Sequence, residues 1–209
     1  MAAREIRKRV NGLQTSSLIL KFACEELARS GSANFSVDRV QQEAGVSRSS
    51  LYHHFGNRDG LITAANIQTI HEELNAGISD LRRQAESLDS GQQIVDLIKA
   101  AVRETSSAFR RDTRQVRAGT FAAGRHSETV SRALREAESR NLEDFTDFLE
   151  YARGRNLLRP QEPMVGTITV ISSLMMGRIV IDVLKDPQVE DAWVEVACDI
   201  VQRLLQPVN

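Results

Sequence analysis

The four prolines of the chain stand at positions 160, 163, 187 and 207, so the first 159 residues lack the strongest helix breaker. Runs rich in Val, Ile and Thr that alternate strictly between apolar and polar residues are essentially absent. Apolar residues recur at helical spacing instead, as in Leu20, Ala23, Cys24 and Leu27. The sequence therefore predicts an all-α fold of about nine helices.

The periodic segments also predict how the chain is divided. An N-terminal arm and three short helices occupy residues 1–60, and longer helices occupy residues 61–209. We expect a small N-terminal helix-turn-helix domain followed by a larger helical domain. The helices are expected at residues 15–30, 37–44, 48–55, 58–86, 92–111, 114–124, 127–153, 163–185 and 189–205.

Residues 35–61 carry the signals of two short helices joined by a tight turn. Ser36 is a good N-cap for the first helix, because its hydroxyl can accept a bond from an otherwise unpaired backbone N–H. Gly45 suits the positive φ with which a helix closes, a conformation that costs other residues a Cβ clash. Ser47 then caps the second helix. This order of cap, turn and cap is typical of a helix-turn-helix.

The second short helix, residues 48–55, has an inward and an outward face. Leu51 and Phe55 point towards the core, and small polar or basic residues point outwards. The guanidinium of Arg48 can read guanine bidentately, and the hydroxyls of Ser49 and Ser50 can read several bases. These residues are therefore candidates for contacts with base edges in a major groove.

Three further residues of this helix suit phosphates, which fix position and carry no sequence information: Tyr52, His53 and His54. The next helix opens with the N-cap Asn57 and the cation Arg58, and an exposed helix N-terminus beside a cation favours a phosphate. The alternative is a small polar hairpin whose outward face is only solvated.

At this point the residues resemble the TetR-type transcriptional regulators, over about residues 19–65. The resemblance rests on Ile19-Leu20, Ala23, Leu27, Gly31, Ala44-Gly45-Val46-Ser47, Leu51-Tyr52-His53-His54-Phe55 and Asn57-Arg58-Asp59-Gly60-Leu61. Gln41 and Phe22 depart from it, since each stands where the family usually has a small alanine. With this family in view, the candidate DNA-binding residues are Ser36, Val37, Ser47, Arg48, Ser49, Ser50, Tyr52, His53, His54 and Arg58.

The charge distribution agrees with a nucleic-acid partner for the N-terminal part only. The formal net charge of the chain is −1, but residues 1–60 carry +3 and the rest carries −4. Four cations, Arg4, Arg7, Lys8 and Arg9, precede the first expected helix. A flexible basic arm there would add phosphate or minor-groove contacts. The alternative is a tail that only solubilises the chain.

The last two helices, residues 163–185 and 189–205, carry apolar residues on nearly all or on a broad part of their surface. A helix that is apolar nearly all round must be buried nearly all round. We expect a two-fold homodimer through a four-helix bundle, as the resemblance also implies. The alternative is that both helices are central in the monomer.

A cavity for a small molecule is expected in the larger domain. Aromatic and methionine side chains that suit an apolar ligand lie on its helices, together with cations that could orient one. The candidates are Phe109, Arg117, Phe121, Phe145, Phe148, Met175, Met176 and Arg178, with Tyr151, Arg125 and His126 as further possibilities. Plain core packing and an intrahelical pair of Arg178 with Asp182 are the alternatives.

Several other chemistries have little support in the sequence. Phosphate-loop, dinucleotide and nucleophile-elbow motifs are absent. His71 begins a zinc-site pattern, but Asn75 stands where the second histidine must be, so we expect neither a metal nor a cofactor. Cys24 and Cys198 lie far apart without a secretory signal, which favours reduced thiols in a cytoplasm. The uncharged stretch 164–177 has 14 residues, too few to span a bilayer.

The sequence thus predicts a cytoplasmic, ligand-responsive, DNA-binding transcriptional regulator without enzymatic activity. By the resemblance it binds a palindromic operator as a homodimer, and the prediction favours a repressor released by a small-molecule inducer over an activator. The first alternative is an all-α module that binds a ligand or a protein but no DNA. The second is a small helical enzyme.

Overall fold

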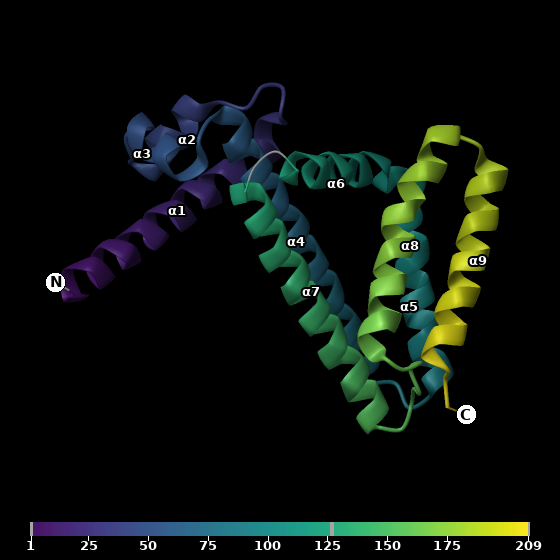
Figure 1. The fold of residues 1–209 in the computed structure, drawn as a ribbon. Coiled ribbons are helices and arrows are strands. Elements are labelled where there is room, and N and C mark those ends of the chain that lie inside the picture. Colours follow the sequence, from purple (N-terminus) through teal and green to yellow (C-terminus); the bar gives the residue numbers. More distant parts are fainter. Residues whose placement is uncertain (1, 126–127, 209) are drawn as a thin grey trace. The chain divides into compact units, whose positions relative to one another are not determined.

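The computed structural model describes residues 2–125 and 128–208, and over these residues the chain is helical apart from short connections (Figure 1). The only pairing of β type in this part of the chain is an isolated antiparallel bridge between Leu158 and Pro207. The predicted all-α fold is confirmed. The elements are α1 (Ala2–Ser30), α2 (Val37–Ala44), α3 (Arg48–Phe55), α4 (Arg58–Ala85), α5 (Gly91–Ser106), the 3-10 turn η1 (Ala108–Arg110), α6 (Arg111–Gly124), α7 (Glu128–Gly154), α8 (Met164–Leu184) and α9 (Pro187–Leu205).

The first helix is longer than the sequence predicted. It begins at Ala2 and not near Thr15, so the backbone at positions 4, 7, 8 and 9 is helical and the expected flexible arm is wrong. The physical reason is composition, because the residues before Gly12 are mostly Ala, Arg, Lys and Glu, which are good helix formers. A contact between these cations and DNA stays a prediction.

The fifth predicted helix is interrupted. It ends at Ser106, and after η1 a new helix starts at Arg111. Ser107 has an extended backbone with ψ of 156°, which breaks the α-helical run. Arg114 stabilises this break, since its Nη1 donates to the carbonyl oxygens of Thr105 at 2.7 Å and Ser107 at 2.9 Å. A side chain from the next helix thus satisfies carbonyls that a helix end leaves unpaired.

The Cα positions of the chain form two compact units. Unit 1 comprises residues 1–71 and 120–137, and unit 2 comprises residues 72–119 and 138–209. Three helices, α4, α6 and α7, contribute residues to both units. The predicted domains, residues 1–60 and 61–209, have their boundary at the end of the helix-turn-helix motif, and that boundary stays a prediction.

Unit 1 has its core where α1, α2, α3 and the start of α4 meet. Ile19, Val40, Leu51 and Leu61 are completely buried there. A second cluster in the same unit joins Ile67 of α4 to the end of α6 and the start of α7. The first residues of α4 are therefore fixed on one side by the short helices of the motif and on another by the α6–α7 segment.

Unit 2 is built on α5, α8 and α9, which pack against one another (Figure 1). Its core contains Ile94 and Val95 of α5, Phe148 and Leu149 of α7, and Val201 of α9, all with no exposed surface. Burial of a large apolar side chain stabilises a fold by roughly 1.5–3 kcal/mol relative to its exposure. This continuous cluster is thus the main source of stability in unit 2.

A buried ion cluster joins α6, α8 and α9 within unit 2. Asp182 of α8 accepts two hydrogen bonds from Arg114 of α6, from Nε at 2.7 Å and from Nη2 at 2.6 Å. Arg178 lies 3.0 Å from the same carboxylate and donates to Glu190 of α9 at 2.9 Å, and Arg111 donates to Glu190 at 2.6 Å. Burial alone would raise the pKa of Asp182, but the bonds from Arg114 and the nearby charges hold it below its ordinary value.

This cluster confirms the predicted intrahelical contact of Arg178 with Asp182 and shows that the pair belongs to a larger set.

By length and composition, α8 is the one helix of the described residues that could cross a membrane, and 28% of its most apolar window is buried. Arg178 and Asp182 lie on that helix and are each 1% exposed, so one face of α8 is committed to α6 and α9. Its opposite face is apolar and open.

Gly91, the first residue of α5, lies where the C-terminal segment crosses the loop after α7. Val208 donates its backbone N–H to the Leu157 carbonyl at 2.8 Å. A Cβ on Gly91 would stand 2.0 Å from that carbonyl oxygen and 2.8 Å from the Val208 nitrogen. Both atoms belong to backbone, so no side chain can move to make room.

We expect Gly91→Ala to destabilise the fold by about 1–3 kcal/mol, because overpacking forces the backbone to shift. Urea unfolding followed by circular dichroism measures this loss. Gly154→Ala is the control, since nothing lies within 4 Å of a Cβ there. Equal stability of the two variants would contradict the proposed steric constraint.

Candidate nucleic-acid interface

The helix-turn-helix is formed by the local signals that the sequence carries. Ser36 caps α2 by accepting a hydrogen bond from the Arg39 backbone N–H at 3.3 Å, and Gly45 ends that helix with φ of 64°. Ser47 caps α3 by accepting from the Ser50 N–H at 3.1 Å. The predicted bounds of α2 and α3 are therefore confirmed.

Glu26 of α1, which the sequence analysis overlooked, fixes the position of α2. Its side chain is fully buried, and its Oε1 accepts from the Ser36 backbone N–H at 3.0 Å and from the Ser30 hydroxyl at 3.0 Å. Its Oε2 accepts from Arg39 Nη1 at 2.9 Å and from Arg29 Nη1 at 3.3 Å. One carboxylate thus joins the end of α1 to the first turn of α2.

The environment of Glu26 favours its charged form. Burial alone would raise its pKa, but the hydrogen bonds from the Ser36 amide, the Ser30 hydroxyl and Arg39 hold the pKa below its ordinary value. The charged carboxylate is therefore the form that stabilises the motif. The only signal in the sequence was an acid directly before Leu27, the last residue of the apolar run of α1, and an acid there is also typical of an exposed position.

Arg58 is engaged by the protein itself. Its Nη2 donates to the Ser32 carbonyl at 2.8 Å and to the Phe35 carbonyl at 3.2 Å, and its guanidinium carbon lies 5.9 Å from the Phe35 ring centroid. Asn57 caps α4 as predicted, since its Oδ1 accepts from the Gly60 N–H at 2.8 Å. Arg58 thus braces the α1–α2 loop, and its contact with a phosphate stays a prediction.

The outward face of α3 is open, while its inward face is closed. Leu51 is fully buried, whereas Arg48, Ser49 and His53 are exposed. Ser50, Tyr52 and His54 are half-buried. Among the other candidates, Val37 is buried and the Ser36 and Ser47 hydroxyls serve as caps. The exposed polar surface of this motif therefore centres on the first turn of α3 and on His53.

Arg48 stands between side chains of two helices. Its Nη1 lies 3.6 Å from Asp38 Oδ1 of α2, and its guanidinium carbon lies 5.8 Å from the ring centroid of Tyr52. The hydrogen bond to Tyr52 and the charge of Asp38 raise the pKa of Arg48 further above its ordinary value. Its charge is therefore fixed at every working pH, while 57% of the side chain remains exposed.

The predicted ligand residues do not gather at one place. Phe109 is 91% exposed on η1, so the expectation that it lines the interior is wrong. The break between α5 and α6 turns this residue outwards. Phe121 and Arg125 belong to unit 1, the other described candidates belong to unit 2, and His126 lies outside the described residues.

The remaining ligand candidates take part in packing or ion pairs. Phe148 is fully buried in the core of unit 2, and Phe145 and Met175 pack against that core, whereas Met176 is half-buried. Arg117 pairs with Glu138 at 3.2 Å, and Arg178 lies 5.7 Å from the ring centroid of Trp193. Core packing accounts for Phe145 and Phe148. Ligand contact by any of these residues stays a prediction.

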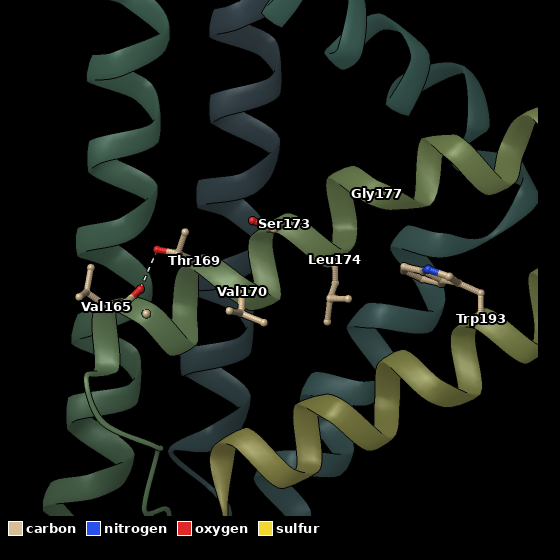
Figure 2. A pocket seen from close by; sticks show the side chains of 8 residues that line it. Val165, Thr169, Val170, Ser173, Leu174, Gly177 and Trp193 are labelled. Atoms are coloured by element: carbon tan, nitrogen blue, oxygen red, sulfur yellow. Dashed lines mark hydrogen bonds between the residues drawn. The ribbon is translucent and has the colours of Figure 1, made fainter.

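A groove that the sequence analysis did not foresee runs along the open face of α8 (Figure 2). It has a volume of about 570 Å³, and Trp193 of α9 lies at one end. Val165 and Val170 are about half exposed in it. The other lining residues are Gly166, Thr169, Ser173, Leu174 and Gly177. Its wall is mostly apolar and most of its residues are small, which suits close packing against another helix better than acid–base chemistry.

Within the residues described, no three or more His, Cys, Asp or Glu side chains lie together so that they could hold a metal ion. His71, the residue that began the zinc-site pattern, is buried in unit 1. Cys24 is half-buried and Cys198 is buried, and neither forms a disulfide within the described part of the chain.

Comparison with known proteins gives a family match for the helix-turn-helix part of the chain. Residues 19–65 match the family model described as bacterial regulatory proteins, tetR family. No curated protein matches the chain. Among solved structures, a TetR transcription regulator from Haloarcula marismortui is 13% identical, with a TM-score of 0.59, and the match covers 92% of this chain and 99% of the other.

Two further structures have the same fold. A TetR-family transcriptional regulator from Streptomyces coelicolor is 19% identical, covers 91% of this chain and 95% of its own, and gives a TM-score of 0.52. A candidate transcriptional regulator from Saccharomonospora viridis, solved in complex with choline, is 13% identical, covers 92% and 97%, and gives 0.55. At these identities the likeness concerns the fold.

We expect Glu26→Gln to lower stability by about 1–3 kcal/mol at neutral pH, because hydrogen bonds to a charged partner are lost or weakened. Since the pKa of Glu26 is lowered in the folded state, its contribution is present above its unfolded pKa and disappears as the pH falls through the folded value. The difference between the two proteins should therefore shrink below about pH 4.

Denaturant unfolding at a series of pH values measures this difference. Glu25→Gln is the matched control, because Glu25 is the neighbouring acid and its side chain is 46% exposed. A loss for Glu26→Gln no larger than that of the control, or one that grows towards low pH, would show that the carboxylate does not hold α2.

Proposed function

We propose that the chain is a repressor of the TetR family, whose family model residues 19–65 match, and that it binds a palindromic operator as a homodimer. A small molecule that binds the larger part of the chain releases it from DNA. The observation that carries this proposal is the capped α3 helix with its exposed Arg48, Ser49 and His53.

DNA binding by this surface follows from its chemistry. An exposed helix of this kind fits a major groove, where arginine reads guanine and hydroxyls read several bases. Ser50, Tyr52 and His54 flank the same face and suit base or phosphate contacts. The N-terminus of α4, capped by Asn57, adds a partial positive charge for a phosphate. We assign base reading to the first turn of α3 and positioning to the other contacts.

A homodimer is supported by the open faces of α8 and α9. Val180 and Val183 of α8 are 69% and 76% exposed, and Val196 of α9 is 60% exposed. Together with Val165, Val170, Leu184 and Val189 they leave a large apolar surface without cover. A second copy of the same surface can cover it through a two-fold axis, which would also supply the second α3 helix that a palindrome requires.

Release by a small molecule is the part of the proposal that involves unit 2. A candidate regulator of the same fold was solved with choline, which supports a small-molecule site in proteins of this architecture. We assign three side chains of unit 2 to such a site. Phe145 and Met175 pack against its core, and Arg117 lies on α6, shortly after the break between α5 and α6. Because α4, α6 and α7 run through both units, a shift in unit 2 has a covalent route to unit 1.

We expect Arg48→Ala to cost about 1–3 kcal/mol of affinity for the operator and to relax the preference for one base pair in each half-site. Binding of fluorescent duplexes that differ at single positions measures both effects. Arg103→Ala serves as the control, because Arg103 is an exposed cation on α5, in unit 2. A small loss that is equal for all sequences would show that Arg48 contacts phosphate only.

We expect Val180→Lys to convert the dimer into a monomer and to abolish tight operator binding, because it places a charge in the middle of the apolar contact. Sedimentation equilibrium at micromolar concentration follows the change. Gln93→Lys, at an exposed position of α5, should leave the dimer intact. Should the unaltered protein sediment as a monomer, or the Val180 variant as a dimer, the proposed interface is incorrect.

A further inference from the structure

Asp38 is a carboxylate on the surface that is proposed to meet DNA. It lies in the first turn of α2, and 79% of its side chain is exposed. A negative charge at such a place repels the phosphate backbone and lowers affinity for every duplex. Helix capping does not explain it, because the N-cap of α2 is the neighbouring Ser36.

The carboxylate of Asp38 stands beside Arg48, one of the side chains to which base reading is assigned. Its Oδ1 lies 3.6 Å from Arg48 Nη1. The nearest contact between the two side chains is made at Nη1, one terminal nitrogen of the guanidinium. Two N–H groups on one edge are what a bidentate contact with guanine uses.

The ring of Tyr52 also restricts the positions that the Arg48 guanidinium can take. This ring packs against the core of unit 1 and so has a fixed position, and the Arg48 guanidinium carbon lies 5.8 Å from the ring centroid. The backbone of Asp38 is also held in place, since the start of α2 is fixed by the Glu26 and Ser36 contacts. A long, flexible side chain is thereby confined between two groups from two helices.

We propose that Asp38 is a positioning residue that determines base specificity by holding the Arg48 guanidinium against Tyr52, away from the phosphates. This inference rests on the proposed function. An exposed ion pair contributes little to folding, but entry into a groove removes water from it and strengthens the attraction. Asp38 thus lowers affinity for DNA in general and raises the preference for one base pair.

The test is Asp38→Asn in the full-length protein, with the operator and duplexes that carry each substitution at the base pair affected by Arg48→Ala. We expect the preference for that base pair to fall about three- to tenfold, a part of the loss from Arg48→Ala. Affinity for unrelated duplex DNA should rise severalfold, because one repelling charge is gone.

The matched control is Asp59→Asn. Asp59 is an acid in the first turn of α4, is 89% exposed and lies 3.7 Å from Arg58 Nη1. It therefore has the same charge and a similar pairing with a cation, but not with Arg48. We expect this variant to raise affinity for unrelated DNA while the base preferences remain unchanged.

A double-mutant cycle shows whether Asp38 acts through Arg48. In the Arg48→Ala background, Asp38→Asn should leave the preference at that base pair unchanged. An equal loss of preference in the two backgrounds, or no loss in the single variant, would overturn the proposal. Thermal unfolding distinguishes a structural role, since a general loss of binding together with a lower melting temperature also overturns it.

Failure of this inference differs from failure of the proposed function. If Arg48→Ala relaxes the base preference and Asp38→Asn does not, the regulator remains and only the positioning role is lost. If the unaltered protein prefers no sequence, both are overturned.

Discussion

The position of α2, the helix that precedes the exposed α3, depends on one buried carboxylate. Glu26 accepts hydrogen bonds from the Ser36 amide and from Arg39, and so holds the start of α2 against the end of α1. An isolated eight-residue helix is marginal in water, so α2 and α3 need such tertiary contacts to persist. Arg58 adds the second brace by bonding to the carbonyls of the α1–α2 loop. The polar surface of α3 is therefore presented by a scaffold whose own polar groups are satisfied.

Unit 2 also contains buried carboxylates that join separate helices, and here the ion pairs are more numerous. The Asp182 and Glu190 carboxylates join α6, α8 and α9 through Arg111, Arg114 and Arg178. Removal of one side chain from such a buried cluster leaves a buried charge without a partner of opposite sign, which strongly destabilises the fold. The cluster fixes the polar side of α8, whereas Val180 and Val183 on its apolar side are exposed. Both the small-molecule response and the dimer of the proposed function thus involve helices that meet at this cluster.

Much of the motif could be predicted from the sequence because its signals are local. Ser36, Gly45 and Ser47 act within three or four residues of themselves, and each does what its residue type favours. Glu26, Arg58 and Arg114 could not be predicted in the same way, because their partners depend on how separate helices pack. Phe109 was misplaced for a related reason: helical periodicity ran through residue 107, where the backbone in fact breaks. The α8 groove likewise depends on which side of an apolar helix the neighbouring helices leave open.

The most direct test of the central claim, that paired α3 helices read DNA, is the selection of bound sites from a pool of randomised duplexes. The account predicts that sequencing of the retained DNA gives an inverted repeat whose half-sites are centred about one helical turn, ~34–36 Å, apart. Two copies of α3 related by a two-fold axis require this symmetry. Retention of no preferred sequence, or of a single site without a repeat, would contradict it.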